Sequence, residues 1–122
     1  MRILVVDDDP IAGAVTSAIL EDGGYQVALV ESGAEALTAL ATGDRAAAVV
    51  SDMNMPAMTG LELLQVLRAQ GVTLPFLLLS GDGPPADGGG SEPDGWLRKD
   101  ENLELDLPAT VGLLLAGRRD GQ

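Results

Sequence analysis

Four apolar runs of the chain each stop at a polar residue that could take part in chemistry. The four are residues 3–6 before Asp7, Asp8 and Asp9, residues 46–51 before Asp52, residues 74–79 before Ser80, and residues 96–98 before Lys99. Apolar runs that end at turn residues indicate buried β-strands. Open α/β sheets build their sites at the carboxyl ends of strands, so we expect these polar groups to converge on one rim of one sheet.

The acidic part of this rim implies a bound cation. Carboxylates that lie close together repel one another unless a positive charge joins them, and a hard divalent ion suits oxygen ligands. With such a cation and suitable donors, an aspartate can act as a nucleophile toward a phosphoryl group. Asp52 is the candidate nucleophile, and Lys99, the only lysine of the chain, supplies a compact positive charge.

Strand and helix signals alternate along the chain, which is typical of a parallel sheet covered by helices on both faces. Residues 2–6 and 27–30 are predicted strands. The first helix should begin with Asp9 as its N-cap and Pro10 as its first residue, and should stop at the glycines 23–24. Its expected buried stripe comprises Ile11, Val15, Ala18 and Ile19.

Capping-box spacings mark two further helices. Ser32 with Glu35 opens a helix to about residue 40, and Thr59 with Glu62 opens one that ends at Gly71. A last helix is expected to begin near residues 106–108 and to end at Gly117. Its side chains expected on the sheet are Leu107, Val111 and Leu114.

Residues 81–95 interrupt this regular alternation. The segment holds six glycines and three prolines in fifteen residues. Glycine costs a helix interior about 1 kcal/mol and proline about 3 kcal/mol, so we expect a long loop here and no full helix. Its composition also predicts high mobility, and we expect it to switch by becoming ordered or released.

Composition bounds the class of protein. A chain of 122 residues fits one domain, which we assign to residues 1–117, with a tail at 118–122. Cysteine and histidine are absent, which excludes disulfides, thiolate or imidazole metal sites and a histidine phosphodonor role. The net charge of −12 argues against nucleic-acid binding, and no apolar stretch approaches a membrane span. The expected compartment is the cytoplasm.

In these motifs the chain resembles the receiver domains of two-component response regulators, over essentially its whole length. The matching segments are residues 3–8, residues 52–56 with Met58 and Gly60, then Ser80, Trp96 and Lys99. One segment alone would mean little, whereas all of them in order are a strong signal. The resemblance implies a flavodoxin-like, doubly wound sheet of five parallel strands, with the fourth helix degraded or replaced by the Gly/Pro-rich loop.

The resemblance also implies a cofactor and its ligands. Asp52 accepts a phosphoryl group, and the cofactor is Mg²⁺. Asp8 and Asp52 hold the ion directly, Asp7 does so largely through water, and Asn54 contributes its backbone carbonyl. Mg²⁺ suits this arrangement because it keeps several waters and takes one or two carboxylates.

Three further residues have roles implied by the resemblance. Lys99 pairs with Asp52 at rest and with a phosphoryl oxygen afterwards, and Ser80 donates its hydroxyl to the phosphoryl group. Trp96 occupies the position of the aromatic switch residue, and the alternative of equal weight is that it covers the sheet edge beside the Gly/Pro-rich loop. Receivers usually have proline after the lysine in a cis peptide bond. Here Asp100 follows, so a trans bond is expected, and its carboxylate is a possible competitor for Lys99.

The function favoured by the sequence is that of a signalling phosphoacceptor in a phosphorelay. Its expected partners are a sensor histidine kinase or a histidine phosphotransfer protein, and an effector protein or output domain. The only reactions expected are its own phosphorylation and autodephosphorylation. The alternatives are a pseudo-receiver that docks without switching, and a small phosphatase of the haloacid-dehalogenase type built on residues 7–11. The phosphatase alternative leaves Asp52 unexplained.

Overall fold

The structure, a computed structural model, describes residues 1–43, 45–81 and 92–120. Its sheet has five parallel strands in the order β2-β1-β3-β4-β5. The strands are β1 (Arg2–Val6), β2 (Gln26–Val30), β3 (Ala48–Asp52), β4 (Phe76–Ser80) and β5 (Gly95–Arg98). The helices of the described residues are α1 (Pro10–Asp22), α2 (Gly33–Ala41), α3 (Gly60–Ala69) and α4 (Leu103–Asp120). This doubly wound, flavodoxin-like architecture is the predicted one.

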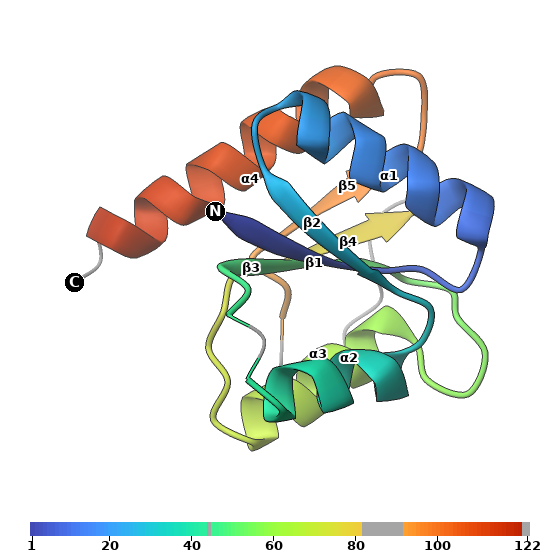
Figure 1. Ribbon diagram of the computed structural model, residues 1–122, viewed down its shortest axis with the longest axis vertical. Coiled ribbons are helices and arrows are strands. Elements are labelled where there is room, and N and C mark those ends of the chain that lie inside the picture. The colour runs from blue at the N-terminus through green and yellow to red at the C-terminus, as the bar shows by residue number, and fades with distance from the viewer. Residues whose placement is uncertain (44, 82–91, 121–122) are drawn as a thin grey trace.

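Two apolar layers hold the helices on the sheet. Helices α1 and α4 cover one face, and α2 and α3 cover the other (Figure 1). Alternate residues of β1 serve the two layers, because Leu4 and Val6 face one and Ile3 and Val5 face the other. All five residues of both β3 and β4 are buried, which explains why these strands appear in the sequence as continuous apolar runs.

The predicted buried stripe of α1 is wrong at three of its four positions, since Ile11, Val15 and Ala18 are exposed and only Ile19 packs partly buried against the core. The residues that α1 buries are Gly13, Thr16 and Leu20, whereas Ile11 and Val15 are 76% and 53% exposed. Apolar residues occupy several sides of α1, so their periodicity does not determine which face is buried. The buried face is the one on which α1 approaches β2 closely at Gly13, where a Cβ would lie only 2.9 Å from the Leu29 Cδ1.

The last helix begins earlier than predicted. Helix α4 starts at Leu103, where the Asn102 carbonyl accepts the N–H of Asp106 at 2.9 Å, and it runs through Pro108 to Asp120. The predicted contact face is confirmed, since Leu107 and Val111 are fully buried and Leu114 packs beside them. The sequence suggested that proline marks the start of this helix, but Pro108 lies inside it.

The capping predictions for the other helices are largely confirmed. Thr59 and Glu62 form the complete capping box of α3. Ser32 caps α2 by accepting the N–H of Glu35, but the Glu35 carboxylate accepts from Glu31 instead of returning to Ser32.

The described part of the chain holds four helices. The expectation of a mobile loop at 81–95 falls largely on residues 82–91, which lie outside the described residues. None of the helices in residues 1–43, 45–81 and 92–120 has the length and apolar character needed to cross a membrane.

Candidate functional site

The carboxyl ends of β1 and β3 bring two aspartates together. Asp7 follows the last residue of β1, and Asp52 is the last residue of β3, the neighbouring strand in the sheet. Asp7 is 2% exposed and Asp52 is 8% exposed, whereas Asp8 is exposed. Oxygen atoms of these three carboxylates lie within 4.8 Å of one another. The acidic cluster expected from the sequence is therefore present on one rim.

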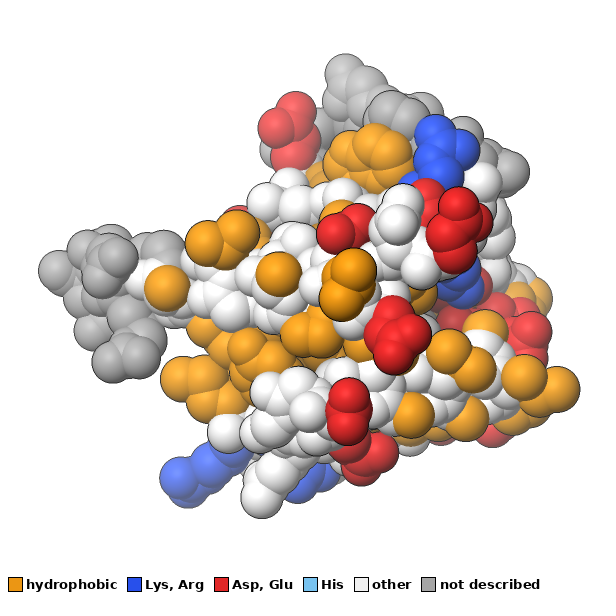
Figure 2. Space-filling model, turned by 90° about the horizontal axis from the view of Figure 1, so that it is seen from above, with side chains coloured by type: hydrophobic (Ala, Val, Ile, Leu, Met, Phe, Trp, Pro, Cys, Tyr) orange, Lys and Arg blue, Asp and Glu red, His pale blue; other side chains and the backbone are white. Residues whose placement is uncertain are grey.

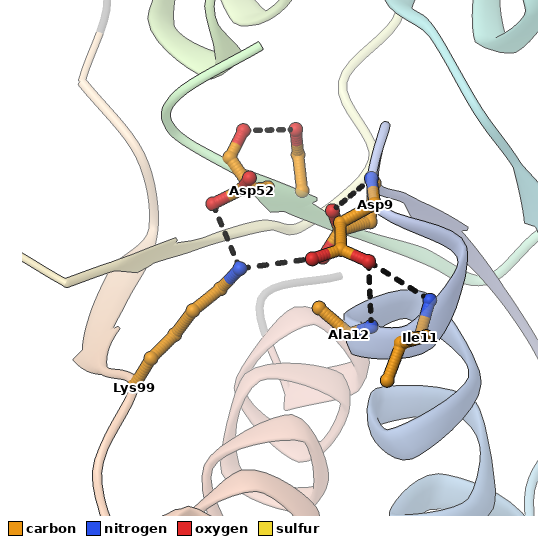
Figure 3. A network of polar contacts seen from close by, with 7 residues as sticks. Asp9, Ile11, Ala12, Asp52 and Lys99 are labelled. Carbon is orange, nitrogen blue, oxygen red and sulfur yellow. Dashed lines mark hydrogen bonds and ion pairs between the residues drawn. The ribbon is translucent and has the colours of Figure 1, made fainter.

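Lys99 brings its ammonium group into this cluster. It follows β5, and its Nζ lies 3.0 Å from Asp52 Oδ1 and 3.3 Å from Asp7 Oδ2. Figure 3 shows the Lys99 side chain reaching toward Asp52, with their ion pair drawn as a dashed line. One cation thus bridges the ends of two strands at rest.

Asp9 belongs to the start of α1 and caps the helix. Its carboxylate accepts the N–H groups of Ile11 and Ala12 at 2.9 and 3.3 Å (Figure 3). Its own N–H donates to Asp7 Oδ1 at 3.0 Å. The cap therefore uses the Asp9 side chain and leaves Asp7, Asp8 and Asp52 to form the acidic cluster.

Burial and charge act in opposite directions on Asp52. Burial raises the pKa of this carboxyl above its usual range, and the hydrogen bond and positive charge of Lys99 offset this effect only in part. The negative charge of Asp7 raises the pKa further, while the N–H of Asn54 lowers it. The ionised Asp52 is thus held at a cost in the folded protein and would gain from a cation.

The pKa of Lys99 shows the complementary balance. Burial alone would lower the pKa of its ammonium group, but the carboxylates of Asp52 and Asp7 outweigh burial and raise it. Lys99 therefore keeps its charge at neutral pH.

The loop from Asp52 to α3 is closed and tightly packed. The N–H of Gly60 donates to the Met53 carbonyl at 2.9 Å, and a Cβ on Gly60 would lie 2.6 Å from the Asp52 carbonyl oxygen. Within the loop, the N–H of Met58 donates to the Pro56 carbonyl at 2.7 Å. This closes a γ-turn around Ala57.

Ala57 has a φ of 68°, a conformation that costs a side-chain-bearing residue energy. The sequence indicated a turn on Pro and Gly but gave no signal for this geometry. The packing role of Gly60 and of the buried Ser51, whose Oγ donates to the Asp52 carbonyl at 2.9 Å, was also missed.

Ser80 and Trp96 lie on the strands beside Asp52. Ser80 is the buried last residue of β4, and its carbonyl accepts the N–H of Lys99 at 3.0 Å. Trp96 pairs in register with Leu78 and packs partly buried against the core on the α2 and α3 face. Its packing leaves both interpretations of Trp96, switch residue and cover for the sheet edge, open.

Asp100 does not compete for Lys99. Its Oδ1 accepts the N–H of Asn102 at 2.9 Å, just before α4. The peptide bond between Lys99 and Asp100 is trans, as expected for a bond before a residue other than proline. The ammonium group reaches the acidic cluster without the usual cis bond.

Comparison with known sequences identifies the family. The family description of the response regulator receiver domain matches residues 3–89, which is more than half of the chain. The chain belongs to the response regulator receiver domains. This receiver is 45% identical over 80 residues to the response regulator MprA of Mycobacterium avium, and 44% identical to that of Mycobacterium tuberculosis. Those matches cover 66% of this chain and about a third of each relative.

Solved receiver structures share the fold. The receiver superimposes on the Francisella response regulator 1452 receiver domain with a TM-score of 0.83, at 26% identity over 96% of this chain and 98% of the other. It also resembles the Vibrio cholerae chemotaxis protein CheY4, with a TM-score of 0.82 and 32% identity. That match covers 93% of this chain and 97% of CheY4.

The response regulator TrrA of Thermotoga maritima, solved in complex with Mg²⁺ and BeF, gives a TM-score of 0.82 at 30% identity, with coverage of 93% and 97%. Receiver domains are signalling modules of two-component systems, and an acidic cluster of the kind found here suits Mg²⁺.

Proposed function

We propose that Asp52 is the phosphoacceptor of this receiver. The observation that carries the proposal is the nearly buried Asp52 carboxylate, placed between an acidic pair and the Lys99 ammonium. A carboxylate oxygen of Asp52 attacks the phosphorus of a phosphohistidine. The new P–O bond forms as the P–N bond breaks, and the imidazole leaves with the electron pair. Water then hydrolyses the aspartyl phosphate, which releases inorganic phosphate and returns the free carboxylate, so the domain acts only on itself.

The residues present fit Mg²⁺ as the cofactor. The carboxylates of Asp7, Asp8 and Asp52 are hard oxygen donors within 4.8 Å of one another. The backbone carbonyl of Asn54 would be the fourth protein ligand. When bound, the ion neutralises the phosphoryl oxygens. Asp8 and Asp52 would hold the ion directly beside the nucleophile, and Asp7 would do so largely through water.

Three residues carry the response to phosphorylation in this proposal. Lys99 exchanges its contact with Asp52 for one with a phosphoryl oxygen, because it is already in reach of the nucleophile. The Ser80 hydroxyl, buried at the end of β4, approaches the phosphoryl group. Trp96 lies on the adjacent strand β5. Its movement after that of Ser80 changes the surface that an effector or output domain contacts.

The phosphodonor docks beside the site on the exposed face of α1. Ile11 and Val15 are strongly exposed on the first turns of this helix. Figure 2 shows the face formed by α1 and α4, where hydrophobic and acidic side chains share the surface. Such a surface suits the helices of a cytoplasmic sensor kinase or of a histidine phosphotransfer protein.

Phosphate-affinity electrophoresis tests the proposal. The chain is incubated with acetyl phosphate and Mg²⁺, and Asp52→Asn and Asp9→Asn are run beside it. We expect a retarded band for the native chain and for Asp9→Asn, whose helix cap an asparagine replaces well. No retarded band should appear for Asp52→Asn, or for the native chain in excess EDTA. A retarded band for Asp52→Asn refutes the assignment.

A further inference from the structure

Met58 connects the loop after Asp52 to the start of α2. It lies in the loop that joins β3 to α3, and it packs partly buried against the core on that face. Its side chain reaches Gly33, the first residue of α2, which Ser32 caps. The helix on the other side of this contact carries none of the site residues. The contact therefore joins α2, which holds no site residue, to the loop that follows Asp52.

Gly33 has no room for a side chain. A Cβ built on Gly33 would lie 2.6 Å from Met58 Sδ and 3.2 Å from Met58 Cγ. Real Cβ atoms do not approach sulfur so closely, so a side chain at position 33 requires the flexible Met58 thioether to move. Glycine at this position lets Met58 lie directly on the backbone of α2.

Met58 is also the residue that closes the γ-turn. Its N–H donates to the Pro56 carbonyl across Ala57, which has the positive φ of 68°. A backbone conformation of this kind persists only where its surroundings hold it. Two contacts hold the loop: Gly60 packs against the Asp52 carbonyl, and Met58 packs against Gly33. Asn54, whose N–H bonds to Asp52, lies between these two points.

We infer that Gly33 is a positioning residue for the metal site, acting through Met58 on the loop that carries Asn54. The inference rests on the proposed function, because Asn54 supplies the carbonyl that the cation would use. Gly33 touches neither cation nor phosphoryl group. By admitting Met58, it fixes the turn and thereby the direction of the Asn54 peptide.

A double-mutant cycle tests the inference. Mg²⁺ affinity is measured by calorimetric titration for the native chain, Gly33→Ala, Met58→Ala and the double variant. The Asn54 amide shift is recorded by NMR in the absence of metal. We expect each single variant to weaken Mg²⁺ binding by about tenfold, the lower end of the range for outer-shell partners, and to move the Asn54 amide. The double variant should bind no more weakly than Met58→Ala, because Gly33 acts only through that side chain.

Gly112→Ala is the matched control. Gly112 also lies in a helix, and a Cβ there would meet only the Tyr25 hydroxyl at 3.5 Å, an ordinary contact. This variant should bind Mg²⁺ like the native chain. Native affinity in Gly33→Ala, additive losses in the double variant, or an equal loss in Gly112→Ala would each overturn the inference.

Two further readouts keep the outcomes separate. If Gly33→Ala does not fold, Met58→Ala alone must shift the Asn54 amide, and an unmoved amide overturns the inference. If the native chain itself binds no Mg²⁺, the proposed metal site fails. The metal-free Asn54 shift still decides whether Gly33 and Met58 position the loop.

Discussion

The Lys99 ammonium lies 3.0 Å from Oδ1 of Asp52, so the proposed phosphoacceptor has a cation of its own at rest. Asp7 shares this cation at 3.3 Å. An incoming divalent ion must compete with Lys99 for the same oxygen atoms. The contact therefore connects metal affinity, the pKa of Asp52 and the response to phosphorylation.

Replacing Lys99 with alanine should preserve or tighten Mg²⁺ binding. The competing ammonium is gone, while the three carboxylates remain. The phosphorylated protein should lose its effect on partner binding or assembly, because no ammonium contacts the phosphoryl oxygen. Calorimetry and a partner-binding assay measure the two effects. Arg98→Ala, which removes an exposed neighbouring cation, should leave both unchanged. Native behaviour of Lys99→Ala in both assays would contradict the role of Lys99.

The stability of the fold should depend on pH through Asp52. Its pKa is raised in the folded protein from an ordinary value of 3.8, so folding disfavours the ionised form. Stability conferred by the protonated form is present below 3.8 and is lost as pH rises through the folded-state pKa. Asp52→Asn should therefore gain stability relative to the native chain as pH rises through this window, by about 1.4 kcal/mol for each unit of displacement. Urea unfolding at pH 3 and pH 7 measures this difference, and a constant difference would contradict the raised pKa.

Gly60→Ala should destabilise the fold. A Cβ at Gly60 would lie 2.6 Å from the Asp52 carbonyl oxygen and 2.7 Å from Leu78 Cδ1. The backbone oxygen has no alternative rotamer, so the strand end or α3 must shift. We expect a loss of about 1–3 kcal/mol in the free energy of unfolding, the usual range for overpacking. Urea titration measures it, with Gly112→Ala as the control that should lose less than half as much.

Arg68 should resist replacement by lysine. Its Nη1 donates to the carbonyls of Val72 and Leu74, and its Nη2 lies 3.0 Å from Asp94 Oδ2, just before β5. A lysine ammonium is a single point and does not span these acceptors. Because the side chain of Asp94 is 43% exposed, we expect a loss of only about 1 kcal/mol. Thermal unfolding should show this for Arg68→Lys and little change for Arg45→Lys, which alters an exposed arginine.

Residues whose role follows from strand order could be predicted from the sequence. Asp7, Asp52, Ser80 and Lys99 all lie at or just after strand ends, and parallel strands bring such positions to one rim. The sheet itself followed from the alternation of strand and helix signals. These features depend on local patterns, which the sequence carries directly.

Features that depend on close approach could not be predicted in the same way. The small residue Gly13 lies on the buried face of α1, whereas Ile11 and Val15, which were expected there, remain exposed. The positive φ of Ala57 and the contact between Met58 and Gly33 arise from packing between distant segments. No periodicity in the sequence marks such contacts. A glycine that admits a close approach cannot be distinguished in the sequence from other glycines in loops or helices.

The most direct test of the account is to locate the phosphoryl group chemically. The chain is phosphorylated with acetyl phosphate and Mg²⁺ and reduced with borohydride, which converts an aspartyl phosphate to homoserine, and the peptides are identified by mass spectrometry. The account predicts homoserine at position 52, dependent on Mg²⁺ and absent without the phosphodonor. Homoserine at position 7, 8 or 9 with none at 52, or no homoserine at all in a protein that binds Mg²⁺, would contradict it.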